Sequence, residues 1–277
     1  MRFHVIIACH NRRALTIRSV IKAQETADAA GIEVDFTVFD DGSRDGTSNA
    51  LSALRHTVLI LKGDGSAFWA KSMALAEQQV LTSTEGGDDE YIVWLNDDVD
   101  IDLKAFEDLL PTLNEHRGAV VVGAMRDPDT SKITYSGMRR NGRHPLNLAL
   151  IMPTAQSQLV DTFNGNLVAV PVEAARVVGG IDGEFSHAFA DIDYGFRCQR
   201  LGIDVVLAPG TYGACPRNAP PLRGSIRGDW RAFTGAKGGG NYHSLRRILR
   251  KSNAWTWWSV IMISYGLWLT RRVLRAG

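Results

Sequence analysis

Acidic side chains crowd together in residues 93–102, VWLNDDVDID, where they follow an apolar run. One amide and four carboxylates occur there: Asn96, Asp97, Asp98, Asp100 and Asp102. Carboxylates this close repel one another unless a cation lies among them. Oxygen ligands suit Mg²⁺ or Mn²⁺, and Mg²⁺ takes one or two protein carboxylates together with phosphate and water. The segment therefore predicts a divalent-cation site beside a diphosphate. The alternative is that Asp100 or, better, Asp102 is the N-cap of a helix over 103–113.

The elements that must position these groups alternate through the first hundred residues. Apolar, β-branched runs predict strands, and apolar residues at helical spacing predict helices. We expect strands at 3–9, from 34 into a turn ending at 47, at 57–63 and at 90–98, with helices at 13–31, 47–54 and 68–83. Thr47 is the expected N-cap of its helix. This alternation predicts a mostly parallel sheet with helices on both faces.

Polar groups follow the ends of all four of these strands. They are Asn11, Asp40–Asp41, Asp64 and Asn96–Asp98. In an open parallel sheet, ligands bind beyond the carboxyl ends of the strands. We therefore expect these groups to share one binding site. The alternative is that each lies in an ordinary solvated loop.

The second half of the chain is less regular. Strands are expected at 120–125, 132–138 and 205–210, a strand leading through Pro171 into a helix at 165–180, and a helix at 191–202. The sequence shows no internal repeat, and no linker forces a domain boundary before about residue 215.

Charge is distributed unevenly along the chain. The 277 residues are 45% hydrophobic with a formal net charge of +1, which suits one large α/β domain with or without an appendage. From residue 223 onward there are eleven Lys and Arg residues and one acidic residue, Asp229, so an acidic body carries a basic tail. Such a tail attracts nucleic acid or anionic lipid headgroups, unless it is only a solvated helix face.

The cysteines and the N-terminus indicate a reducing compartment. Cys9, Cys198 and Cys215 match neither a zinc site nor a disulfide framework. The opening residues MRFHVIIACHNRR contain only a short apolar run, and we read no signal peptide in them. A cytoplasmic location is therefore expected.

Four segments together resemble the successive signatures of family 2 glycosyltransferases, which have the GT-A fold. They are VIIACHNR, VFDDGSRDGT, VWLNDDVD and HAFADIDYGFRCQRLG, within roughly residues 3–210. LKGDGSAFWAKSMALA is similar to a subset found in bacterial surface-polysaccharide clusters, some of them rhamnosyltransferases. The resemblance implies a Rossmann-like α/β catalytic domain at 1–222, with a nucleotide-binding half at about 1–100 and an acceptor-binding half at about 101–222. A basic lid and amphipathic helices would follow at 223–277.

The resemblance also implies a nucleotide-sugar site at the strand ends. It comprises Ala8, Cys9, Asn11, Arg12, Asp40, Asp41, Gly42, Asp64, Trp69, Lys71, Asn96, Asp97, Asn164 and Gly165. Asp40 would accept a hydrogen bond from a pyrimidine N3–H, which favours uracil or thymine, and Asp41 would hold the turn or the ribose. Trp69 would stack on a sugar or pack in the core, and Gly165 would permit close approach in the sugar pocket.

The metal ligands follow from the same resemblance. Asn96-Asp97-Asp98 aligns with the family's DxD element, with Asn96 in place of the first Asp. That departure leaves Asp98 as the best ligand of Mn²⁺ or Mg²⁺ and Asp97 as the second. Asp100 would contribute through water.

Many relatives supply a further metal-binding His after a later strand, where this chain reads APGTYGACPRN. Cys215 in that segment is a poor ligand for Mg²⁺ or Mn²⁺. His243 would serve only if the tail folds back, and His187 is a candidate for contact with the acceptor.

A second acidic cluster, ADIDYGFR, resembles the family's Glu-Asp element beside the acceptor. Ala190 stands in place of the usual Glu, and Asp191 takes the position of the general base of inverting members. An acceptor hydroxyl has a high pKa, so a carboxylate must take its proton as the new bond forms. The alternative is that Asp191 caps the following helix and pairs with Arg197. Asp193 would have a supporting role.

The tail suggests two further functions. Residues 223–251 are basic and Gly-rich and would close over the diphosphate, with Arg227, Arg231 or Lys237 on phosphate oxygens. Residues 254–269 are uncharged, rich in Trp and flanked by arginines. They are too few for a typical membrane span and are typical of an interfacial helix, which predicts peripheral contact with the inner membrane. The alternative is docking on the body or on a second subunit of a homodimer.

These features together predict an inverting, metal-dependent glycosyltransferase with a UDP- or dTDP-sugar donor and a saccharide or lipid-linked saccharide acceptor. The alternatives are a sugar-phosphate nucleotidyltransferase, whose Gly-rich loop with Lys is missing after the first strand, and a non-catalytic nucleotide-sugar binding protein. Acidic strand ends would repel nucleic acid. The absence of G-x-G-x-x-G after the first strand disfavours an NAD-dependent enzyme.

Overall fold

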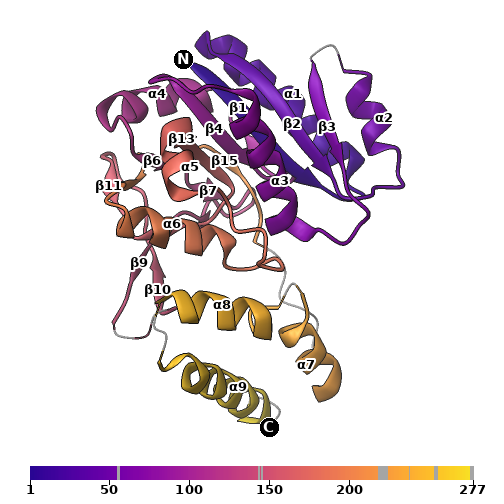
Figure 1. Ribbon diagram of the computed structural model, residues 1–277, viewed down its shortest axis with the longest axis vertical. Helices are drawn as coiled ribbons and strands as arrows, with labels where there is room; N and C mark the ends of the chain where they lie inside the picture. The colour runs from indigo at the N-terminus through magenta and orange to yellow at the C-terminus, as the bar shows by residue number, and fades with distance from the viewer. Residues whose placement is uncertain are drawn as a thin grey trace.

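An eight-stranded sheet forms the centre of the chain in the computed structural model (Figure 1). The structure describes residues 1–54, 57–142, 144, 146–217, 224–236, 238–252 and 255–274. In spatial order the strands are β11 (Gln158–Leu159), β14 (Val205–Leu207), β6 (Val120–Val122), β13 (Leu167–Pro171), β4 (Glu90–Leu95), β1 (Arg2–Cys9), β2 (Glu33–Asp40) and β3 (Val58–Lys62). Strands β1 to β4 are mutually parallel, and β13 runs antiparallel to both neighbours. The expected mixed, mostly parallel α/β fold is confirmed.

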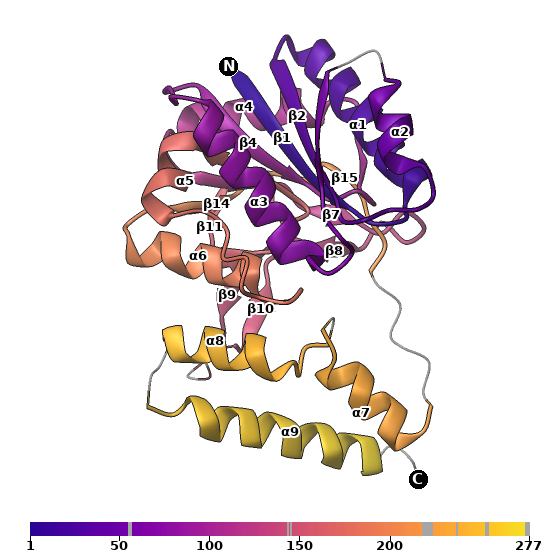
Figure 2. The ribbon, with the colours of Figure 1, turned by 45° about the vertical axis from the view of Figure 1, so that its right-hand side comes forward.

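Helices cover both faces of the sheet (Figure 2). They are α1 (Arg13–Ala30), α2 (Thr47–Ser52) and α4 (Ala105–Glu115) on one face, and α3 (Phe68–Ser83), α5 (Val172–Val178) and α6 (Ala190–Arg200) on the other. Strand β1 shows why two layers form, because successive side chains of a strand point to opposite faces. Val5 and Ile7 belong to the same core as Val20 of α1, whereas Ile6 belongs to the core that contains Met73 of α3.

Two small sheets lie beyond the central one. The first contains β5 (Asp100–Ile101), β15 (Gly213–Ala214), β7 (Met125–Arg126) and β8 (Ile133–Tyr135), and the second contains β10 (Leu148–Leu150), β9 (Gly137–Arg140) and β12 (Thr162–Phe163). Strand β5 comes shortly after Asp97 and Asp98. Its antiparallel pairing with β15 holds the backbone of this segment in place. The β9–β10 hairpin extends toward the C-terminal helices (Figure 1).

The tail folds as three helices below α6 and the β9–β10 hairpin: α7 (Ile226–Thr234), α8 (Tyr242–Ser252) and α9 (Trp257–Leu274) (Figure 2). Leu245 and Ile248 of α8 are buried in the same core as Phe185. The predicted boundary at residue 222 lies outside the described residues, so the division into two domains stays a prediction. Within the part of the chain that is described, we find no helix whose length and apolar character would carry it across a membrane.

Four charged residues, which we call the clasp, join α8 to the body: Asp182, Asp193, Arg247 and Lys251. Asp182 Oδ2 accepts from Arg247 Nε at 2.6 Å and from Lys251 Nζ at 2.5 Å. Lys251 Nζ also donates to Asp193 Oδ2 at 2.9 Å. The tail is therefore held by ion pairs as well as by apolar packing.

The start of α2 differs from the expectation. Thr47 is the first residue of the helix, and the N-cap is Gly46 with φ 81°. The Thr47 hydroxyl donates to the Asp45 carboxylate at 2.5 Å instead of capping the helix.

The start of α4 also differs. Lys104 stands at the N-cap position, so neither Asp100 nor Asp102 caps the helix. The Asp102 carboxylate instead accepts two hydrogen bonds from Arg126, at 2.6 and 2.8 Å. A two-bond guanidinium–carboxylate contact is stronger than a single cap hydrogen bond, which accounts for the difference.

Candidate functional site

Two connected cavities open at the carboxyl ends of β1 and β4. The first, of about 270 Å³, is lined by Ala8, Cys9, His10, Arg12, Asp41, Gly65, Phe68, Trp69, Ser72, Asp97 and His187. The second, of about 300 Å³, is lined by Arg12, Trp69, Asn96, Asp97, Asp98, Tyr135, Asn164, Gly165, Asn166, His187, Ala188, Phe189, Asp191, Ile192 and Cys215. The two share Arg12, Trp69, Asp97 and His187, so they form one site.

The predicted residues divide into two groups. Those that line the cavities are Ala8, Cys9, Arg12, Asp41, Trp69, Asn96, Asp97, Asp98, Asn164, Gly165 and Asp191. Those that line neither are Asn11, Asp40, Gly42, Asp64, Lys71 and Asp100. The strand-end argument supplies Asp41, Asn96, Asp97 and Asp98 of the first group, and the second group lies outside both cavities.

Asp41 fixes the turn that borders the first cavity. Its carboxylate accepts hydrogen bonds from the backbone N–H groups of Gly65, Ala67 and Phe68, at 2.9, 3.2 and 2.9 Å. A Cβ at Gly42 would lie 2.8 Å from the Gly65 nitrogen, so the two turns touch backbone to backbone. Holding the turn is one of the two roles predicted for Asp41.

Asp40 points elsewhere. Its carboxylate accepts from the Ser43 N–H at 2.9 Å and from the Ser48 hydroxyl. Together with Gly42 it lines a separate cavity of about 320 Å³ beside α2. The predicted contact of Asp40 with a pyrimidine stays a prediction that this geometry does not favour.

Three other predicted residues lie outside both cavities. The Asn11 side chain accepts from the Arg44 N–H at 2.8 Å. Asp64 accepts from the Ser66 N–H and hydroxyl at 3.0 and 2.6 Å. Lys71 lines a different cavity, between α3 and the turn after α5.

Arg12 bridges the two central carboxylates. Its Nη1 donates to Asp97 Oδ1 at 2.9 Å and to Asp98 Oδ2 at 3.0 Å. Burial raises the pKa of Asp97 to about 6, which Arg12 opposes and the neighbouring Asp98 charge reinforces. The guanidinium is thus the positive charge that lets these acids lie together in the structure.

Asp100 does not join this pair. Its carboxylate contacts Lys22 and lies 3.8 Å from Arg18 Nη2, both on α1. These ion pairs hold Asp100 on the α1 side of the loop. Its predicted role as a water-mediated ligand is therefore not supported by its position.

Trp69 joins the two halves of the site. Its indole N–H donates to Asn96 Oδ1 at 2.8 Å, and its ring contacts Trp94 edge to face at 6.3 Å between centroids. A Cβ at Gly165 would lie 2.9 Å from Trp69 Cη2. Gly165 therefore permits close approach, as predicted, but the group it admits in this structure is the Trp69 ring.

Asp191 lies at the N-terminus of α6 and faces the second cavity. Its Oδ2 accepts from the Gly165 N–H at 3.2 Å and its Oδ1 from the Ile192 N–H at 2.8 Å. Desolvation by burial raises its pKa, and these backbone bonds only partly oppose the effect. A half-buried carboxylate with a raised pKa is suited to accepting a proton.

The predicted pairing of Asp191 with Arg197 is not found. Arg197 Nε instead donates to Asp193 Oδ2 at 2.8 Å, and its Nη1 donates to the Val178 carbonyl at 2.7 Å. Asp193 is 1% exposed and also contacts Lys251 of the clasp. The supporting role of Asp193 stays a prediction.

The donor set fits one mode of Mg²⁺ or Mn²⁺ binding. Asp97 and Asp98 supply two carboxylates, which is the usual protein share when a diphosphate and water complete the shell. Among the described residues, no group of three His, Cys, Asp or Glu side chains could hold a metal by itself. Cys215 Sγ lies 3.8 Å from Asp98 Oδ1, and burial raises the pKa of this thiol to about 12. Sulfur is a poor ligand for Mg²⁺ or Mn²⁺.

The remaining tail candidates lie away from the acidic pair. Arg227 and Arg231 are exposed on α7, and His243 is exposed on α8. None of the three lines either cavity. Lys237 lies outside the described residues.

Sequence reasoning missed nine residues that line the site: His10, Gly65, Phe68, Ser72, Tyr135, Asn166, Ala188, Phe189 and Ile192. His10 stood between two predicted residues and could have been found from its place at the strand end. Phe68 and Phe189 have positive φ values of 55° and 78°, which a sequence does not display. Such conformations in bulky residues cost free energy and cluster at functional sites.

Comparison with known families gives one match. Residues 4–167, more than half of the chain, match the family described as Glycosyl transferase family 2. No curated protein sequence matches the chain significantly.

Solved structures share the fold. TarS of S. aureus, residues 1–349, has a TM-score of 0.54 at 15% identity, covering 78% of this chain and 60% of that one. GalNAc-T7 with UDP, GalNAc and Mn²⁺ has a TM-score of 0.63 at 13% identity, covering 94% and 49%. Mannosyltransferase PcManGT from Pyrobaculum calidifontis, in complex with GDP-Man and Mn²⁺, has a TM-score of 0.52 at 16% identity, covering 83% and 59%. The chain thus spans less than two thirds of each of these structures, and the similarity concerns the fold alone.

Proposed function

Because the chain belongs to glycosyl transferase family 2, we propose that it is an inverting, metal-dependent glycosyltransferase. It would move a sugar from a UDP- or dTDP-sugar to a hydroxyl of a saccharide or lipid-linked saccharide, in the synthesis of a bacterial surface polysaccharide. One observation carries the proposal: Asp97, Asp98 and Asp191 line the same cavity of about 300 Å³. A displacement at an anomeric carbon needs a metal ion to neutralise the leaving diphosphate, held here by Asp97 and Asp98. It also needs a base to take the proton of the acceptor hydroxyl, here Asp191.

Asp191 is the proposed general base. The acceptor oxygen bonds to the anomeric carbon as the bond from that carbon to the diphosphate oxygen breaks, and the acceptor proton moves to the Asp191 carboxylate. The Gly165 N–H, 3.2 Å from Oδ2, orients this carboxylate. Its raised pKa increases its proton affinity in the bond-forming step.

Asp97 and Asp98 are the proposed ligands of Mn²⁺ or Mg²⁺. The bound ion would neutralise the charge that develops on the leaving diphosphate. In the structure Arg12 contacts both carboxylates. When a metal ion binds the carboxylates in its place, the guanidinium would be free to contact phosphate oxygens of the donor. The neighbouring structures of GalNAc-T7 and the P. calidifontis mannosyltransferase contain Mn²⁺, which supports this assignment.

The donor base is proposed to be uracil or thymine. Asp41, and not Asp40, lines the first cavity, so we assign the contact with a pyrimidine to Asp41. A carboxylate can accept from the imide N3–H of these bases. TarS was solved with UDP-GlcNAc and GalNAc-T7 with UDP, while the mannosyltransferase was solved with GDP-Man.

We also propose that α9 contacts the cytoplasmic face of the inner membrane. Trp258, Met262, Ile263 and Leu269 on this helix are exposed, with relative exposures from 49% to 65%. Apolar and Trp side chains beside arginines are typical of interfacial helices. Docking of the same surface on a second subunit would instead give a homodimer, and sedimentation of the full chain with and without anionic vesicles separates the two.

A panel of UDP-, dTDP- and GDP-sugars with Mn²⁺ tests the function. The expected result is release of a nucleoside diphosphate that requires Mn²⁺ and a pyrimidine donor. A nucleotidyltransferase would instead consume sugar phosphate and nucleoside triphosphate and release diphosphate. A binding protein would retain the donor without turnover, so either result would contradict the proposal.

A further inference from the structure

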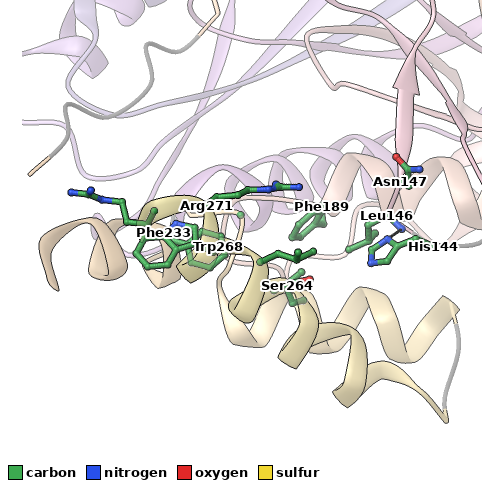
Figure 3. Close-up of a pocket in the computed structure, with 12 residues that line it drawn as sticks. His144, Leu146, Asn147, Phe189, Phe233, Ser264, Trp268 and Arg271 are labelled. Carbon is green, nitrogen blue, oxygen red and sulfur yellow. Dashed lines mark hydrogen bonds between the residues drawn. The ribbon is translucent and has the colours of Figure 1, made fainter. Parts of the chain in front are cut away.

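A third cavity, of about 750 Å³, lies between the tail helices and the body (Figure 3). Its walls are mainly apolar: Leu146 from the hairpin side, Phe189, Leu245 of α8, Phe233 of α7, and Leu267 and Trp268 of α9. The Phe233 and Trp268 rings stack at 5.3 Å between centroids, which fixes one wall. A volume of this size is in the range of ligand sites.

This cavity adjoins the candidate active site through one side chain. Phe189 lines both the third cavity and the cavity that contains Asp191. It stands two positions before Asp191, at the N-cap of α6, and its φ of 78° turns the chain there. A ligand that passes Phe189 would therefore reach from the apolar cavity to the proposed base.

The cavity also carries positive charge. Arg271 lies across it with its guanidinium on the side of Phe189 (Figure 3). Within the described part of the chain, Arg271 forms no ion pair within 4 Å, whereas Arg272 is held by Asp229 at 2.7 Å. Arg271 is therefore available for an anion on the side of the cavity that Phe189 lines.

We propose that the third cavity binds the lipid part of the acceptor: a long apolar chain bearing a phosphate or diphosphate group. The apolar chain would lie along Leu267, Trp268 and Phe233, and the phosphate would contact Arg271. The attached sugar would then pass Phe189 and present its hydroxyl to Asp191. This inference depends on the proposed glycosyltransferase function and specifies its acceptor as an anionic, lipid-linked saccharide.

The charge pattern favours this occupant over a second copy of the chain. The tail from residue 223 onward has eleven basic residues and only one acidic residue, Asp229, which Arg272 already holds. The tail of a second copy would bring further positive charge to Arg271. An anionic amphiphile complements both the arginine and the apolar walls.

Decyl phosphate, kept below its critical micelle concentration, probes the cavity in the full chain by titration calorimetry. We expect saturable binding with one molecule per chain, and binding at least about tenfold weaker for decanol, which lacks the charge, and for inorganic phosphate, which lacks the chain. Equal affinity for decyl phosphate and decanol, or no saturable binding, would overturn the proposal. A shift of the chain to dimers that abolishes binding would show that a second copy fills the cavity.

Two serines on α9 provide a matched pair of variants. Ser264 lines the cavity and Ser259 does not. The Ser264 hydroxyl donates to the Val260 carbonyl of the same helix, and the Ser259 hydroxyl donates to the Thr256 carbonyl, just before the helix begins. Ser264→Phe should fill the cavity and weaken decyl phosphate binding at least about tenfold, while Ser259→Phe should leave it unchanged. Arg271→Gln should reduce decyl phosphate affinity to that of decanol. Thermal melting curves of the two serine variants show whether each is folded. Equal decyl phosphate affinities in two folded variants would contradict the assignment.

Turnover separates this inference from the proposed function. If the chain transfers sugar to a water-soluble saccharide but Ser264→Phe lowers neither decyl phosphate binding nor transfer to a lipid-linked acceptor, the cavity proposal fails and the function stands. If no nucleotide sugar is bound or turned over, the proposed function itself fails. Decyl phosphate binding would then identify a lipid site without supporting the acceptor role.

Discussion

The first hundred residues and the tail are held in place by different kinds of interaction. Around the first cavity, turns are fixed by backbone N–H groups, as where Asp41 accepts from Gly65 and Phe68. The tail helix α8 is fixed by the clasp, which joins side chains far apart in the sequence, as where Asp182 accepts from Lys251. Backbone contacts tolerate little displacement, whereas side-chain ion pairs depend on pH and salt. We therefore expect the donor side of the site to be rigid and the tail to be adjustable.

The largest expected effect is that of replacing Asp191, the proposed general base. Asp191→Asn keeps the size of the side chain and an oxygen for the Gly165 N–H, but it cannot take a proton. Turnover should fall by about 10²–10⁴-fold while the affinity for nucleoside diphosphate is unchanged. Steady-state kinetics and calorimetry on the same preparation check both parts. Asp129→Asn, at an exposed position, is the control, and unchanged turnover in Asp191→Asn would refute the assignment.

The next largest effect concerns Arg12, whose positively charged guanidinium lies in the site. Arg12→Gln removes the guanidinium that contacts Asp97 and Asp98. Mn²⁺ alone should then bind more tightly, because it no longer competes with a resident positive charge. A nucleoside diphosphate should bind roughly tenfold more weakly, because a charge-assisted contact to phosphate is lost. Titration of each ligand separately distinguishes these opposite changes, and two changes of the same sign would contradict this role.

Two glycine-to-alanine substitutions compare how tightly the site and the tail are packed. Gly165→Ala places a Cβ 2.9 Å from the Trp69 ring and should reduce the free energy of unfolding by about 1–3 kcal/mol. Gly266→Ala, in the middle of α9 with no atom within 4 Å of the added Cβ, should be neutral or stabilise by up to about 1 kcal/mol. Chemical denaturation of both variants measures the difference. Equal effects would show that the two regions are packed alike.

The smallest effect is expected in the clasp. Despite burial, Arg247 and Lys251 lower the pKa of Asp182 to about 2 from an ordinary 3.8. A lowered pKa in the folded state means that the clasp contributes fully above about pH 4 and is lost as pH falls toward 2. Asp182→Asn should remove at most about 2 kcal/mol and should flatten this acid dependence.

Limited proteolysis of α8 as a function of pH measures the loosening of the tail. The variant should be cleaved at neutral pH about as fast as the wild type is at pH 2–3, with protease resistance of the body retained. A wild-type tail that is equally resistant at pH 3 and pH 7 would contradict the role of the clasp.

The fold and many of the residues that line the two cavities were predictable because their signals are local. Strand-end positions alone gathered Asp41, Asn96, Asp97 and Asp98, since parallel strands end at one edge of a sheet. The helix positions at 13–31 and 68–83 followed from apolar spacing and agree with α1 and α3.

What could not be predicted depends on contacts between remote segments. Asp100 and Asp102 read as part of the acidic cluster, but Lys22 and Arg126 hold them outside it. Glu77, within the predicted helix at 68–83, was not singled out, yet it is fully buried and accepts from the Ile181 N–H. Desolvation raises its pKa to about 7. Such pairings are set by the packing of elements and leave no local pattern.

The central claim is that Asp97 and Asp98 bind a cation together with the diphosphate of the donor. Calorimetry of UDP binding with and without Mn²⁺, on the wild-type chain and on Asp98→Asn, tests it most directly. The account predicts that Mn²⁺ strengthens UDP binding at least about tenfold in the wild type and has no effect in the variant. UDP binding that is the same with and without Mn²⁺ in the wild-type chain would contradict it.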